Sequence, residues 1–97
     1  MVLAVARIAI HLPQSRSLKD KRRVMKSLLA RVRNQFQVAA GEVAEQDRWQ
    51  LGVLGLACVS TDAAHADEVI SRAVAFVAAS LPEGDMLDYE TEVVHVF

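Results

Sequence analysis

The chain has 97 residues, of which 53% are hydrophobic and 24% charged, a balance that excludes a disordered, collagen-like or disulfide-built protein. The length predicts a single domain over residues 1–97. Eleven Lys and Arg against twelve Asp and Glu give a formal net charge of -1, which excludes the strong overall basicity of many nucleic-acid binders. The charges are unevenly spread, however: residues 16–33 hold eight basic residues and one acid, whereas residues 62–97 hold eight acids and one basic residue.

The first predicted element is a strand over residues 2–12, where apolar side chains occupy both faces and Pro13 ends the pattern. Arg7 interrupts this segment and no basic stretch precedes it, so we interpret it as a strand and not as a signal peptide. No apolar run approaches the roughly 20 residues that cross a bilayer. Cys58 is the one cysteine, so no internal disulfide can form. We therefore expect a cytoplasmic protein with no membrane contact.

A helix is predicted over residues 17–35, because apolar residues recur there at helical spacing. Ser17 is a favourable N-cap, and Asp20 completes a weak capping box. Most of the helix's cations form one flank, Arg31 lies on the far side, and Lys21 falls inside the apolar sector, where we expect it to extend toward solvent. Cations in the first turns oppose the helix dipole, which indicates a functional constraint.

Extended segments follow at residues 36–43 and 49–60, with a polar turn between them. A second helix is predicted over residues 62–80, a break at residues 82–85, and a last, amphipathic strand over residues 86–97. The order is βαββαβ. It predicts an α+β fold of the ferredoxin-like, split βαβ type, a four-stranded antiparallel sheet of order 4-1-3-2 with two helices on one face.

The uncovered face of such a sheet should be polar unless another molecule covers it. The first and third strands are instead apolar on both sides, and a large exposed apolar patch favours association. We predict a homodimer or higher oligomer joined through the sheet faces or edges. The predicted interface residues are Leu3, Val5, Trp49, Leu54 and Leu56.

The positive charge of the first helix predicts binding to a polymeric phosphate, because cations along about three helical turns match a nucleic-acid backbone better than one small ligand. The expected phosphate contacts are Arg16, Lys19, Arg22, Arg23, Lys26 and Arg33. An additional anion site is expected at the helix N-terminus, formed by Ser15, Arg16, Ser17 and Lys19. No aromatic residue interleaves these cations, which favours recognition of a backbone or a shape over base stacking. The competing interpretation is a solvated basic face neutralised by acids from elsewhere in the fold.

Signals for other chemistry are weak. The histidines lack the spacing of a metal-binding pair, and Cys58 in its apolar strand is expected to be a buried thiol. An acylphosphatase-like hydrolase is a remote alternative: Arg16 and Asn34 supply the residue types, but residues 12–14 lack a glycine-rich phosphate cradle.

The acidic residues before Trp49 allow several interpretations. A plain solvated turn is favoured. The alternatives are a site for a divalent cation or a basic partner, or a pairing with the basic helix across a dimer, and they rest on Glu42, Glu45 and Asp47.

Two stretches carry a resemblance to a known family. Residues 15–24, with the sequence Ser-Arg-Ser-Leu-Lys-Asp-Lys-Arg-Arg-Val, continuing through Leu28-Leu29 to Phe36, resemble the small bacterial YlxP-like family, a domain of unknown function. Residues 42–50, with an acidic and Gln-Asp turn ahead of Trp49, resemble its second signature. The resemblance implies a ferredoxin-like fold and dimerisation, and it carries over no activity and no catalytic residue.

Members of that family are often encoded beside translation and ribosome-maturation genes, which implies a connection with RNA or the ribosome. We therefore expect a non-enzymatic bacterial factor that binds structured, ribosomal RNA and uses no cofactor, metal or small-molecule substrate. The alternative is a protein-interaction or structural dimer module without nucleic acid.

Overall fold

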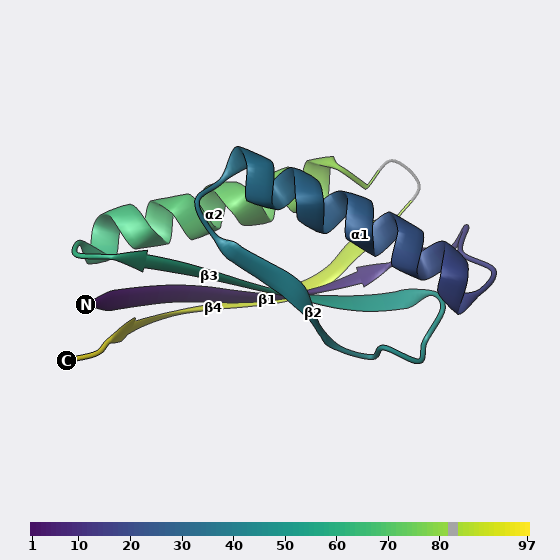
Figure 1. Ribbon diagram of the computed structural model, residues 1–97, viewed down its shortest axis with the longest axis horizontal. Helices are drawn as coiled ribbons and strands as arrows, with labels where there is room; N and C mark the ends of the chain where they lie inside the picture. Colours follow the sequence, from purple (N-terminus) through teal and green to yellow (C-terminus); the bar gives the residue numbers. More distant parts are fainter. Residues whose placement is uncertain (82–83) are drawn as a thin grey trace.

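The computed structural model describes residues 1–81 and 84–97. Its elements are β1 (Val2–His11), α1 (Leu18–Gln35), β2 (Ala39–Ala44), β3 (Leu51–Ser60), α2 (Ala63–Ala79) and β4 (Asp85–His95). The strands form one antiparallel sheet of order β2-β3-β1-β4, and both helices lie on one face of it (Figure 1). This is the predicted order read from the other edge, so the α+β, ferredoxin-like prediction is confirmed. The predicted break at residues 82–85 falls partly outside the described residues.

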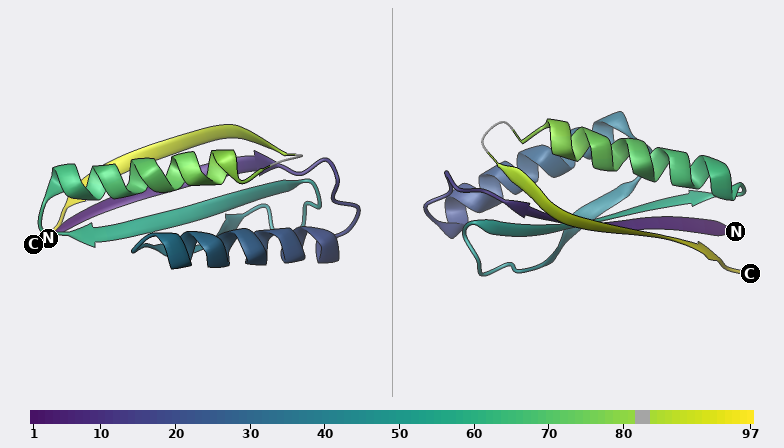
Figure 2. Two further views of the ribbon diagram at one scale, coloured as in Figure 1. Left: turned by 90° about the horizontal axis from the view of Figure 1, so that it is seen from above. Right: turned by 180° about the vertical axis from the view of Figure 1, so that it is seen from behind.

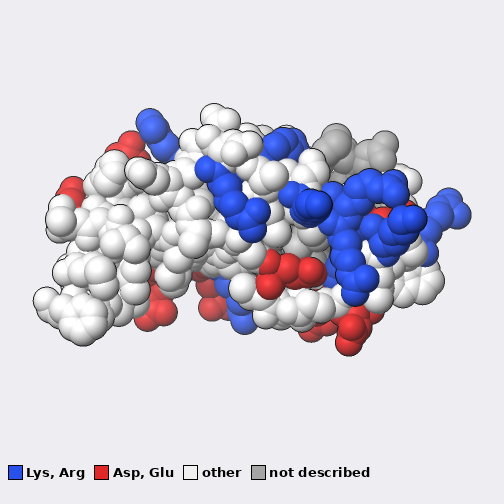
Figure 3. All heavy atoms as spheres, in the orientation of Figure 1, with Lys and Arg blue, Asp and Glu red and all other residues white. Residues whose placement is uncertain are grey.

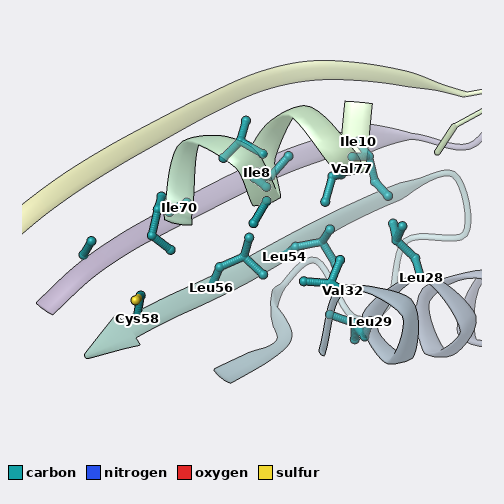
Figure 4. Packing of buried hydrophobic residues seen from close by; sticks show 14 of the residues in the cluster. Ile8, Ile10, Leu28, Leu29, Val32, Leu54, Leu56, Cys58, Ile70 and Val77 are labelled. Atoms are coloured by element: carbon teal, nitrogen blue, oxygen red, sulfur yellow. The ribbon is translucent and has the colours of Figure 1, made fainter. Parts of the chain in front are cut away.

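The core lies between the sheet and the two helices (Figure 4). Every second residue of β1 points into it, and Ile8 and Ile10 are completely buried. From β3, Leu54, Leu56 and Cys58 meet the buried faces of the helices. The predicted buried thiol is thereby confirmed.

The two edges of the sheet carry different helices. α1 packs against β2, whereas α2 packs against β1, β3 and β4. Seen from behind, both helices lie above the sheet, and among the described residues no helix lies below it (Figure 2). The basic helix and the acidic last strand are therefore at opposite sides of the molecule.

The register between the central strands corrects part of the predicted interface. Leu54 pairs with Ile8, and residues directly opposite in an antiparallel pair share a face. Leu54 and Leu56 are therefore in the core, 0% and 2% exposed, and the prediction that they lie on the open face is wrong. When a strand is apolar on both sides, its sequence does not show which side faces the core. In β3 this is decided by its register with β1. The open face instead carries Leu3, Val5, Val53, Ala57, Val59 and Val94.

Two predicted boundaries also shift. Phe36 is the C-cap of α1, where its ring packs edge-on against Phe76 with centroids 5.6 Å apart, so β2 begins only at Ala39. Trp49 lies in the turn before β3, which begins at Leu51. Apolar character alone had extended both predicted strands into flanking turns.

Candidate nucleic-acid interface

The solvent side of α1 and the loop before it is covered with positive charge. Figure 3 shows Lys and Arg side chains gathered over α1, most densely toward its N-terminal end. We call this the basic surface. It is formed by seven exposed residues: Arg16, Lys19, Arg22, Arg23, Lys26, Arg31 and Arg33.

These cations differ from the arginines elsewhere in the chain. Each arginine outside residues 16–33 has a carboxylate partner, in the pairs Arg7–Glu90 at 2.6 Å, Arg48–Glu45 at 3.8 Å and Arg72–Glu68 at 3.5 Å. On the basic surface, no such pair forms with any residue in 1–81 or 84–97. The competing interpretation required acids from elsewhere in the fold to pair with these cations. Among the described residues, none does so within salt-bridge distance.

The arrangement works against the stability of the helix. Lys19 and Arg23 are four residues apart, as are Arg22 and Lys26, and like charges at this spacing repel each other. Lys19 also stands in the first turn, where the positive end of the helix dipole disfavours a cation. A polyanion lying along α1 would relieve both effects.

Arg33 is tied into the fold more firmly than the other cations. Its Nη2 donates a hydrogen bond to the carbonyl oxygen of Ala40, 2.6 Å away, and so links the end of α1 to β2. The guanidinium has further donors, so Arg33 can still contact a phosphate, but with less freedom.

Lys21 is not part of the surface. Its side chain is completely buried, and the prediction that it extends toward solvent is wrong. Its ammonium lies 3.0 Å from Glu42 Oε2 and donates to the carbonyl oxygens of Glu45, Gln46 and Leu51 at 2.7, 3.3 and 3.1 Å. The turn between β2 and β3 folds over the first turn of α1 and provides these acceptors, which the helical pattern could not reveal.

The acidic cluster before Trp49 is largely used within the chain. Glu42 pairs with Lys21, and Glu45 with Arg48. Among the described residues, no three His, Cys, Asp or Glu side chains are grouped so that they could hold a metal ion. The pairing with the basic helix that was considered across a dimer thus occurs within one chain.

The anion site expected at the helix N-terminus is occupied by the protein's own groups. The Ser15 hydroxyl is buried and donates to the Ser17 carbonyl oxygen at 3.2 Å, and the Ser17 hydroxyl accepts from the Asp20 amide at 3.1 Å. The Asp20 carboxylate in turn accepts from the Arg16 amide at 3.0 Å. The Ser15 hydroxyl is therefore used within the chain, and the Ser17 hydroxyl serves as the predicted N-cap, while Arg16 and Lys19 remain exposed.

A cleft of about 470 Å³ runs along the other flank of α1, toward the end of α2. Arg23 and Arg31 line it together with Val24 and Ser27. The helical wheel placed Arg31 apart from the other cations. The structure brings it to the same wall as Arg23, so the basic surface extends further around α1 than the sequence indicated.

One finding concerns the acylphosphatase-like hydrolase alternative. Arg16 precedes α1 and Asn34 lies in its last turn, about 25 Å away at 1.5 Å per residue, so the two cannot converge on one phosphate as the hydrolase alternative requires. Among the described residues, no helix is long and apolar enough to cross a membrane.

Comparison with known proteins gives a family and a fold. Residues 3–91 match the model of the family described as "Protein of unknown function (DUF503)". The "Uncharacterized protein YlxP" of Bacillus subtilis (strain 168) is 40% identical over 76 residues, which are 78% of this chain and 82% of that protein. Among solved structures, the de novo designed protein Foldit4 superposes with a TM-score of 0.54 at 13% identity, covering 99% of this chain and 98% of the design, a likeness of fold alone.

Proposed function

This chain belongs to the DUF503 family of proteins of unknown function, and we propose that it is a non-enzymatic cytoplasmic factor that binds structured RNA, ribosomal RNA in the first place, through the basic surface of α1. One observation carries the proposal. The arginines elsewhere are paired with carboxylates, whereas the basic surface has no such partner among the described residues. A surface that keeps its charges uncompensated at a cost in helix stability is suited to a polyanionic ligand.

The shape of the surface supports a duplex or a folded RNA as the ligand. From Lys19 to Arg33 the helix rises about 21 Å at 1.5 Å per residue, long enough to follow several consecutive phosphates. Exposed arginine and lysine side chains on a convex helix contact a backbone from outside, which is how RNA is recognised by shape.

The acids of β4 leave this surface accessible. Asp88, Glu90 and Glu92 are on β4, at the edge of the sheet opposite β2, and α1 packs on the β2 side. An RNA lying along α1 therefore does not approach the acidic strand. The net charge of -1 is compatible with the proposal because many of the acids, those of β4 among them, lie away from α1, at the opposite edge of the sheet.

We also propose that a second copy of the chain covers the open face of the sheet. This face is apolar at the end where Leu3, Val59 and Val94 pair, and Val59 is 64% exposed there. Arg7 lies on the same face among the acids of β4, so two copies related by a two-fold axis can exchange contacts between Arg7 and these carboxylates. A dimer joined in this way keeps both copies of α1 on the outside.

A salt titration with a purified ribosomal RNA fragment tests the proposal. If five surface cations contact phosphates, the logarithm of the association constant should fall with the logarithm of the salt concentration with a slope of about -4. A lack of binding at low salt would contradict the proposal and favour a module that meets an acidic protein surface.

A further inference from the structure

Trp49, the one tryptophan of the chain, stands exposed in the turn between β2 and β3. Its residue surface is 54% exposed, which is unusual for a large aromatic side chain with so much apolar area to bury. It belongs neither to the core cluster nor to a strand. The fold therefore does not account for the indole at this position.

The turn that carries Trp49 is fixed on the side of α1. Buried Lys21 donates to the carbonyl oxygens of Glu45 and Leu51, at 2.7 and 3.1 Å, on either side of Trp49. The ammonium holds both ends of the turn against the first turn of the helix. The indole is thus attached to a backbone that is anchored before any ligand binds.

The next residue fixes the turn to the loop that leads into α1. The Gln50 side-chain amide donates to the carbonyl oxygens of Pro13 and Ser15, at 3.2 and 3.1 Å, and the Gln50 carbonyl oxygen accepts from the Leu12 amide at 2.8 Å. Arg16 follows directly in this loop. Figure 1 shows the turn beside the N-terminal end of α1, where the basic surface is densest.

We infer that Trp49 stacks on an unpaired base of the RNA whose phosphates contact Arg16 and Lys19. The inference rests on the proposed function and deepens it by naming the class of RNA: a duplex interrupted by a bulge or a loop. A base that leaves the duplex exposes both its faces, and an indole is a stacking surface for any base. Because the turn is fixed beforehand, stacking costs little ordering of the protein.

The test compares two RNA hairpins that differ by one bulged nucleotide. The fluorescence anisotropy of end-labelled RNA measures the affinity of every variant, and the fluorescence of Trp49 reports stacking in the wild type. Since no other tryptophan is present, any quenching reports on this residue. The wild type should bind the bulged hairpin about 5- to 150-fold more tightly than the paired one, in line with the usual effect of one stacked base. The bulged hairpin, and not the paired one, should quench the fluorescence.

Two variants separate stacking from charge. Trp49→Ala should lose the preference for the bulge and keep the affinity for the paired hairpin, and Trp49→Phe should recover part of the preference. Equal binding of both hairpins by the wild type without quenching would overturn the inference and leave the proposed function intact. Failure of the wild type to bind either hairpin would contradict both the inference and the proposed function. Fluorescence that changes with protein concentration in the absence of RNA would place Trp49 in a contact between copies and also overturn the inference.

Discussion

Lys21 Nζ lies 3.0 Å from Glu42 Oε2, and the lysine side chain is completely shielded from solvent. The contact joins α1 to β2, and the same ammonium holds the turn that carries Trp49. A lysine in a run of basic residues thus has a structural role distinct from that of its neighbours. It fixes the position of the basic surface relative to the indole.

Replacing Lys21 by methionine should destabilise the fold by about 3–5 kcal/mol, because the Glu42 carboxylate would lose its buried counter-charge and three carbonyl oxygens would lose their donor. Urea unfolding measures the change. Lys26→Met, at an exposed position of the same helix, is the control and should stay within about 0.5 kcal/mol of the wild type. Equal stability of the two variants would contradict the structural role of Lys21.

Lys19→Glu should strengthen the fold while weakening RNA binding. An acid in the first turn of α1 interacts favourably with the helix dipole, and the substitution removes the repulsion from Arg23, so unfolding should cost about 0.5–1 kcal/mol more. Thermal unfolding and RNA affinity are measured on the same preparation. A variant that is both less stable and unchanged in RNA affinity would show that Lys19 serves the fold.

The open sheet face is tested by Val59→Asp. Sedimentation of the wild type should give a dimer, and a carboxylate in the apolar end of that face should give a folded monomer. Ala75→Asp, at an exposed position of α2, is the matched control and should remain dimeric. A wild type that sediments as a monomer at micromolar concentration would contradict the proposed dimer.

The fold could be predicted because its elements differ in period. Apolar residues alternate through β1 and recur at helical spacing through α1, and Ser17 and the Ser60–Asp62 stretch mark the helix starts that the structure shows as caps at Ser17 and Asp62. The placement of Leu54 and Leu56 could not be predicted, because β3 is apolar on both sides and only its register with β1 orients it.

The cations of the candidate site could be identified from the sequence, but the position of Trp49 beside them could not. The cations are local in sequence, so their concentration on α1 was visible in the printed chain. The absence of aromatic residues among them favoured pure backbone recognition. Trp49 reaches the same end of the molecule from a turn 30 residues after Lys19, through contacts of Lys21 and Gln50 that no local pattern encodes.

The most direct test of the basic surface is a pair of matched charge reversals, Lys26→Glu on α1 and Arg72→Glu on α2. Both change the net charge equally at exposed helix positions, but Arg72 already pairs with Glu68. The affinity for one ribosomal RNA fragment and its salt dependence are measured for each. Lys26→Glu should weaken binding at least tenfold and flatten the salt slope by about one, while Arg72→Glu should leave both near the wild type. Equal losses in the two variants would show that only net charge matters and would contradict a binding surface on α1.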